Sequence, residues 1–339
     1  MEMQHTMTVA FLVLNHRPPA QLLRLLTTLR RGDPAAPLVV HHDRFRSELA
    51  ESEIETLGNV HLLLSDAPVV WGDFSVVKAY WRSLNWMLER MEFDWVVVLS
   101  AQDYPIKPLT ELRETLSRSG VDAFIQATRI NDLTDPEQHA EMRLRYLYQY
   151  RRIPLIPAPA NGGVLHRLGH RGQELFFDTA NALQSHVHFY KLPDGLPRRV
   201  GIRARSTPFD ATFPCWYGNM WSILSRRSVE LLVTVTRSRP EYVAYYRRTI
   251  IPDESATHTI ICNARELHIQ PIDLHYARWT RGVSGHPDVF GVADLPELLA
   301  SPSYFARKFD IAQDADVLDQ LDQAIMRGPS FSEDAPTDR

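Results

Sequence analysis

Polar side chains follow the most continuous apolar run of this chain. In FDWVVVLSAQDYPIK the run Val96–Leu99 is followed by Ser100, Gln102, Asp103 and, after a proline, Lys107. Such a run is typical of a strand buried on both faces of a parallel sheet. Open α/β sheets bind ligands at the carboxyl ends of these strands. The stretch therefore predicts a ligand site, although a plain strand exit with a solvated Asp explains the residues equally well.

Three earlier segments carry polar or aromatic groups at corresponding places. LNHR ends the first predicted strand, HHDRFR ends the second, and VVWGDFS follows the third. Asp43 suits a ribose or a base edge, Trp71 a stacking surface, and arginines such as Arg44 an anionic group. Together the segments predict a long ligand crevice. A metal site is not predicted, because His41, His42 and the nearby carboxylates show no fixed spacing.

Two later groups of charged residues have types suited to transfer chemistry. In PDES, Asp253 and Glu254 lie at the start of a predicted helix, where the helix dipole favours a carboxylate with or without a function. Either becomes a general-base candidate only if it faces the crevice. In FARKFD, Arg307 and Lys308 lie between two phenylalanines. The pair suits a pyrophosphate clamp, and it fits a basic pair on a helix surface as well.

The elements that position these residues alternate between strand and helix over the first 130 residues. Apolar patterning predicts strands at 9–14, 37–41, 60–64, 95–99 and 123–126, and helices at about 20–29 and 74–91. This rhythm predicts an α/β fold with a mostly parallel, doubly wound sheet flanked by helices. No GxGxxG or GxxxxGKS motif follows a predicted strand, which argues against dinucleotide and P-loop sites.

The segment 131–215 has a less regular pattern. EMRLRYLYQYRRIP, which contains Arg145 and Tyr146, fits either an aromatic and basic acceptor wall or a solvated helix end. The proline-rich stretch after it predicts long excursions from the core. Order returns with a short strand at 219–224 and a helix for which Ser225 is the expected N-cap.

Composition narrows the class of protein. The chain has 339 residues, a net charge of -4 and 44% hydrophobic residues, which is typical of a globular protein and argues against a nucleic-acid binder. Cys215 and Cys262 are too few for a disulfide framework. No apolar run is long enough to span a bilayer, and the start of the chain lacks the basic character of a signal peptide. A cytoplasmic protein without a transmembrane segment is expected, with peripheral association at the inner membrane face left open.

Seven segments occur in an order that resembles a known family. LNHR, HHDR, VVWGDFS, LSAQDYPIK, WYGNMWSILSRRSV, PDES and FARKFD resemble the Core-2/I-branching glycosyltransferase family, over about residues 7–310. That family includes branching β-1,6-N-acetylglucosaminyltransferases and peptide O-xylosyltransferases. The resemblance implies a GT-A-like nucleotide-diphospho-sugar transferase fold, a UDP-sugar donor, inversion at the anomeric carbon, and no cofactor or divalent metal. Independently, the strand end SAQD lacks the second Asp of the Asp-x-Asp pair that usually holds a metal.

The resemblance also implies roles for individual residues. Glu254 matches the family's catalytic Glu, and Arg307 with Lys308 match its diphosphate-binding residues. A further upstream Arg is expected, with Arg278 and Arg281 as the candidates. The full expected site comprises Glu254 as the base; Asp43, Arg44, Trp71, Asp103, Arg278, Arg281, Arg307 and Lys308 on the donor side; and Arg145, Tyr146, Trp216 and Asp253 on the acceptor side.

The chain departs from animal members of this family in having no membrane anchor and no disulfide framework. It therefore resembles a soluble, bacterial-type version, in which a single catalytic domain is expected over 7–310. Within it we expect a nucleotide-binding half at 7–130 and an acceptor half at 131–310, with a C-terminal helix and a disordered tail in 311–339. GlcNAc is the first expected donor sugar and xylose the second, with a glycan or glycoconjugate as acceptor. A non-catalytic binding module that kept the fold is the alternative.

Overall fold

A computed structural model describes residues 7–152, 164–190, 199–280 and 286–327. Its centre is a seven-stranded sheet with the strand order β13-β6-β12-β4-β1-β2-β3. Four neighbouring strands are parallel: β4 (Trp95–Ser100), β1 (Val9–Asn15), β2 (Leu38–His42) and β3 (Val60–Leu64). The predicted parallel sheet is confirmed, with β4 in the interior as its unbroken apolar run indicated.

The other side of this sheet contains a reversed strand. β12 (Ser222–Ser225) runs antiparallel to both β4 and β6 (Ala123–Ile125), and β13 (Ile269–Gln270) is parallel to β6. The strand expected at 219–224 therefore begins later and runs against its neighbours. The helix after it, α7 (Arg226–Ser238), begins as predicted, because the Ser225 side chain accepts a hydrogen bond from the Ser228 amide.

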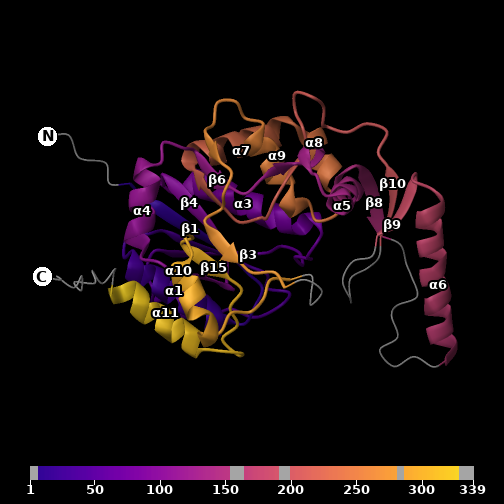
Figure 1. Ribbon diagram of the computed structural model, residues 1–339. Helices are drawn as coiled ribbons and strands as arrows, with labels where there is room; N and C mark the ends of the chain where they lie inside the picture. The colour runs from indigo at the N-terminus through magenta and orange to yellow at the C-terminus, as the bar shows by residue number, and fades with distance from the viewer. Residues whose placement is uncertain (1–6, 153–163, 191–198, 281–285, 328–339) are drawn as a thin grey trace, which may run out of the picture.

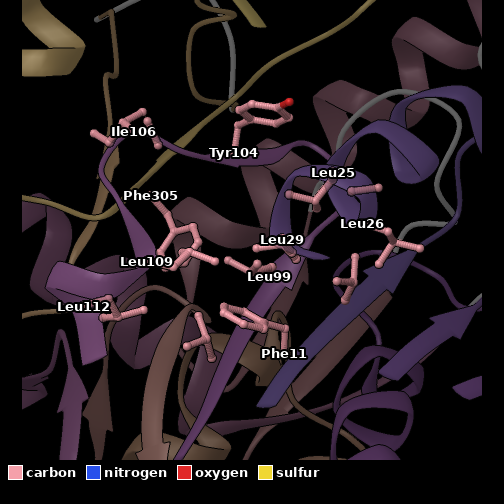
Figure 2. Close-up of a cluster of buried hydrophobic side chains, with 14 of the residues drawn as sticks. Phe11, Leu25, Leu26, Leu29, Leu99, Tyr104, Ile106, Leu109, Leu112 and Phe305 are labelled. Carbon is pink, nitrogen blue, oxygen red and sulfur yellow. The ribbon is translucent and has the colours of Figure 1, made fainter. Parts of the chain in front are cut away.

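Helices cover both faces of the sheet. Figure 2 shows part of the first apolar layer, which α1 (Pro19–Gly32), α4 (Leu109–Arg118) and α11 (Asp316–Arg327) form with alternate residues of the strands. The opposite layer comes from α3 (Phe74–Arg90), α7, α8 (Pro240–Tyr246) and α9 (Ala256–Cys262). Figure 1 shows the sheet between these groups. This is the expected doubly wound arrangement.

A smaller sheet brings the C-terminal part of the chain to the end of β4. Its strand order is β14 (His275–Ala277), β15 (Phe305–Arg307) and β5 (Asp103–Pro105). β5 lies just beyond β4, and its antiparallel register with β15 places Arg307 opposite Asp103. This short strand was not predicted from the sequence. It is the element that brings two distant motifs, LSAQDYPIK and FARKFD, side by side.

A third group of elements projects from the main body, at the right of Figure 1. It contains the antiparallel strands β8 (Tyr148–Arg152), β10 (Arg199–Arg203) and β9 (Val187–Tyr190), with α6 (Val164–Leu183) packed on β9. α5 (Pro136–Tyr146) leads into it from a strand pair, β7 (Thr128–Arg129) with β11 (Trp216–Tyr217). The described parts of the segment 131–215 thus contain more helix and strand than the sequence pattern predicted, while the proline-rich stretch lies outside the described residues.

The remaining short elements connect these layers. They are α2 (Glu51–Glu55), α10 (Leu295–Ala300) and the 3-10 turns at Ile130–Asp132, Pro252–Glu254 and Val292–Asp294. None of the helices in the described ranges combines the length and apolarity that a membrane span requires.

Candidate active site

The carboxyl ends of the parallel strands lie level with one another. Asn15 pairs with His42, and Leu14 with Ser100, so the segments after β1, β2 and β4 leave the sheet at one edge. Asp43, at this edge, is buried, and its carboxylate accepts hydrogen bonds from the Ser65 hydroxyl at 3.1 Å and the Val69 amide at 2.9 Å. It holds the loop that leads to Trp71.

Cationic groups gather at this edge. The pKa of His16, after β1, is lowered by desolvation and then by the charges of Arg17 and Arg46. The pKa of Lys308 is lowered by burial and by the charges of Arg17 and Arg307. His286 has a pKa lowered by desolvation and by Lys308 and Arg307. These shifts have one physical cause besides desolvation: like charges lie close together around a shared space.

An aromatic ring adjoins these cations. The Trp71 ring is half-buried, and its centroid lies 6.0 Å from that of His286 in an edge-to-face arrangement. Arg44, by contrast, is exposed and lies over the Phe45 ring at 5.3 Å. The structure therefore brings Trp71 beside the cations named above, while Arg44 is committed to a surface contact.

Arg307 is held in place from two sides. Its guanidinium carbon lies 4.3 Å above the Trp221 ring, and its Nε is 3.7 Å from the buried Asp103 carboxylate. The second Asp103 oxygen accepts from the Ser100 amide at 2.7 Å. Burial lowers the pKa of Arg307, while Asp103 and Glu254 raise it. Asp103 thus anchors this cation, and no ion pair joins Lys308 to a carboxylate in the described ranges.

Glu254 is near enough to Arg307 for the charge of each to shift the pKa of the other. Its carboxylate accepts a hydrogen bond from Arg145 Nη1 at 2.8 Å, and its side chain remains 32% exposed. Burial raises the pKa of Glu254, and the charge of Arg145 opposes this rise. The same carboxylate raises the pKa of Tyr217, so that ring also adjoins it. An accessible carboxylate with a raised pKa can act as a general base.

The turn that carries Glu254 is built by close backbone contacts. Gly218 donates its amide to the Glu254 carbonyl at 2.8 Å, and a Cβ at Gly218 would lie 1.8 Å from the Gln126 carbonyl oxygen. Ile251, just before the turn, has a φ of 48°, which is unusual for a β-branched residue. Strain of this kind is concentrated at functional sites.

Three residues assigned to the acceptor side are buried or held in contacts of their own. Tyr146 is fully buried and donates its hydroxyl to the Ile251 carbonyl at 3.0 Å, so it is a core residue. Trp216 and Tyr217 point to opposite faces of a strand, and it is Tyr217 that adjoins Glu254. The Trp216 ring instead bonds Asn263 through Nε1 at 3.3 Å. Asp253 is buried behind Glu254.

Of the two candidates for the upstream arginine, only Arg278 lies within the described residues. Arg278 forms ion pairs with Asp288 at 3.0 Å, Asp294 at 2.8 Å and Glu297 at 2.7 Å, so three carboxylates neutralise its charge. It stabilises the segment before β15 and is poorly placed to bind a diphosphate. Arg281 lies outside the described residues.

Arg17 follows β1 directly, and the sequence pattern already placed it among the strand-end arginines suited to an anionic group. Sequence reasoning assigned no role to three other residues that the structure brings to the site. His286, Tyr217 and Trp221 carry no such signal, since only long-range packing brings them there. No group of three or more His, Cys, Asp or Glu side chains that could hold a metal ion is found in the described ranges.

Comparison with known proteins identifies the family. The profile of the Core-2/I-Branching enzyme family matches residues 9–151 and 191–299. The chain therefore belongs to the Core-2/I-branching enzyme family, and the resemblance noted in its motifs is confirmed.

Curated relatives match over most of this chain. β-Glucuronosyltransferase GlcAT14B of Arabidopsis thaliana is 24% identical over 94% of this chain and 66% of its own length. Human xylosyltransferase 1 is 23% identical over 93% of this chain and 30% of its own length. The chain thus spans less than two thirds of these proteins. Among solved structures, HddC from Yersinia pseudotuberculosis matches 66% of this chain and 79% of its own at 12% identity, with a TM-score of 0.27.

Proposed function

We propose that this protein is an inverting, metal-independent glycosyltransferase that moves a sugar from a UDP-sugar to a hydroxyl group of a glycan or glycoconjugate. The observation that carries the proposal is that Arg307 and Glu254 lie near enough for the charge of each to shift the pKa of the other. A cationic space suited to a diphosphate adjoins a partly exposed carboxylate with a raised pKa. A transferase needs these two groups on either side of the reacting carbon. The family to which the chain belongs supports this proposal.

The proposed reaction is a single displacement. The diphosphate lies against Arg307 and Lys308, and the nucleoside extends toward Trp71 and Asp43. The acceptor oxygen forms a bond to the anomeric carbon from the opposite face and transfers its proton to Glu254. The bond from that carbon to the diphosphate oxygen breaks, and UDP leaves with the electron pair. The two cations stabilise the negative charge that develops on the leaving group, as a metal does in other enzymes.

The donor sugar is proposed as GlcNAc, with xylose as the alternative. The names of the relatives, which include a β-glucuronosyltransferase and a xylosyltransferase, add UDP-glucuronic acid to the sugars that need testing. The acceptor is proposed to approach the Glu254 side chain, which is 32% exposed although Arg145 binds one of its carboxylate oxygens.

The test combines donor binding with turnover. Thermal stabilisation and transfer are measured for UDP-GlcNAc, UDP-xylose and UDP-glucuronic acid in the presence of EDTA. We expect one donor to stabilise the wild type and to be consumed. Glu254→Gln should bind it equally well and lose turnover by about 10²–10⁴-fold, the typical value of general-base assistance.

Glu266→Gln is the matched control, because it makes the same chemical change at an exposed position after α9. It should leave both readouts unchanged. Undiminished transfer by Glu254→Gln, or binding that requires added metal, would refute the proposal. Binding of a UDP-sugar without turnover in the wild type would favour a non-catalytic binding module.

A further inference from the structure

The residues 152–190 lie between the two stretches that the family profile matches. In the structure they include α6 and β9, which project from the main body (Figure 1). One residue of this stretch nevertheless reaches the candidate base through a chain of contacts. Tyr190, at the end of β9, donates its hydroxyl to the Glu141 carboxylate of α5.

Arg145 connects this contact to Glu254. Its Nε donates to Glu141 at 2.9 Å and lies 3.3 Å from the Tyr190 hydroxyl oxygen, while its Nη1 donates to Glu254 at 2.8 Å. A guanidinium is planar, so groups that bind its Nε edge also fix the direction of its Nη atoms. The orientation of Arg145 toward Glu254 therefore depends on Glu141 and Tyr190.

Packing makes this connection rigid. Tyr190 is 8% exposed, and its ring meets the Tyr150 ring edge to face at 5.8 Å. Tyr150 in turn donates its hydroxyl to the Leu144 carbonyl of α5 at 2.9 Å. The strands β8 and β9 thus each form a hydrogen bond to α5. The bond from Tyr150 is to a backbone carbonyl, whereas the Tyr190 hydroxyl also contacts the Arg145 side chain.

We propose that Tyr190 and Glu141 are positioning residues that hold Arg145 against the base, Glu254. Tyr190, which lies outside the family match, then supports the active site. This inference rests on the proposed function, because it assigns a role to Arg145 only if Glu254 accepts a proton.

The charged and titratable groups around Glu254 determine the direction of the effect. Arg145 and Arg307 lower its pKa, from α5 and β15. Glu141, also on α5, raises it, and burial raises it most. The remaining neighbours, Asp253 on the same turn, Tyr146 on α5 and Tyr217 on β11, are groups whose own pKa values Glu254 raises. Loosening Arg145 therefore raises the pKa of Glu254. Because a base must be unprotonated, activity then begins to fall at a higher pH than in the wild type.

The test compares pH profiles of kcat/KM for the wild type, Tyr190→Phe and Tyr150→Phe. Tyr190→Phe should move the acidic limb of the profile to higher pH by roughly half a unit. On that limb kcat/KM should fall about 3-fold, with little change on the alkaline side. Tyr150→Phe removes a hydroxyl from the same aromatic cluster without touching Arg145, so its limb should not move. Arg145→Lys, which cannot bind both carboxylates in the same way, should move the limb in the same direction even if Tyr190→Phe folds poorly.

Two results would overturn the inference: an unmoved limb in Tyr190→Phe, or an equal movement in Tyr150→Phe. These outcomes are distinct from failure of the proposed function. If Glu254→Gln keeps full transfer activity, the base itself is wrong. If Glu254→Gln is inactive and the limb of Tyr190→Phe coincides with that of the wild type, only the positioning role is wrong.

Discussion

The two sides of the candidate site differ in how their charges are balanced. On the donor side, burial and the charges of Arg17 and Arg307 lower the pKa of Lys308. The Asp310 carboxylate, which pairs with Arg17 at 3.3 Å, offsets this only in part. On the base side, Arg145 lies between two carboxylates, those of Glu141 and Glu254, and its pKa is raised. A group of neighbouring cations that carboxylates do not fully neutralise is suited to binding a polyanion.

The balanced side is suited to a different task. A cation paired with two carboxylates adds little net charge, so it would bind an anion weakly. It can still adjust the protonation of one partner, because Arg145 opposes the rise that burial causes in the pKa of Glu254. This difference agrees with the proposed division, in which one side binds an anion and the other transfers a proton, and the following predictions test it.

The largest effect on binding is expected at Lys308. Burial and the neighbouring cations Arg17 and Arg307 lower its pKa, and Asp310 is the one acidic group among its main electrostatic neighbours, so its charge suits the proposed diphosphate. Lys308→Ala should weaken UDP binding by about 10- to 100-fold, the typical loss for one hydrogen bond to a charged group. Isothermal titration calorimetry with UDP measures this, and Glu254→Gln should bind UDP like the wild type. Equal losses in the two variants would contradict the division.

Asp253 tests the base side through stability. Burial and the neighbouring Glu254 raise the pKa of Asp253 to about 7. The folded protein therefore keeps a proton that the unfolded chain releases near its ordinary value of 3.8, and stability falls as pH rises through that window.

Asp253→Asn keeps a neutral side chain at all pH values. The difference in free energy of unfolding between the variant and the wild type should move in favour of the variant by about 1 kcal/mol or more from pH 4 to pH 8. One pKa unit corresponds to about 1.4 kcal/mol. Urea unfolding at both pH values measures the difference. A variant whose stability follows the wild-type pH dependence would show that Asp253 is ionised in the folded state.

Proton uptake provides a smaller signal from the donor side. His16 and His286 have lowered pKa values, with desolvation as the main cause and nearby cations as the next. A diphosphate bound among them would offset the effect of the neighbouring cations and raise both pKa values. UDP binding near pH 6 should take up on the order of a few tenths of a proton. Calorimetry in two buffers of different ionisation enthalpy detects this, and net proton release would show that the diphosphate binds elsewhere.

The smallest effect on binding is expected at Arg278. Three carboxylates already pair with it, and its side chain is 34% exposed. Arg278→Ala should change UDP affinity by less than about twofold and lower stability by about 1 kcal/mol, as is typical of partly exposed ion-pair networks. Calorimetry and urea unfolding report the two quantities. A loss of affinity as large as that of Lys308→Ala would show that its charge is available to the donor.

Much of the scaffold was predictable from local patterns. The strands of the parallel half, the helix at 74–90 and the Ser225 cap follow from apolar periodicity and capping, which depend on neighbours in the sequence. The order of the motifs was sufficient to identify the family, because each motif is read from residues that are adjacent in the chain.

The partners of each charge were decided by the tertiary structure. The sequence offered Arg278 and Arg307 in similar settings, yet one is neutralised by three carboxylates and the other faces a single buried Asp at 3.7 Å. Likewise, Tyr146 is buried in the core while Tyr217 reaches Glu254.

These outcomes depend on the reversed strand β12, the short strand β5 and the contact between β9 and α5. Each of them joins residues far apart in the chain. The sequence by itself therefore determined which elements form and which family they belong to. Only the folded structure decided which side chains share a site, because electrostatic and hydrogen-bond partners are selected by distance in space.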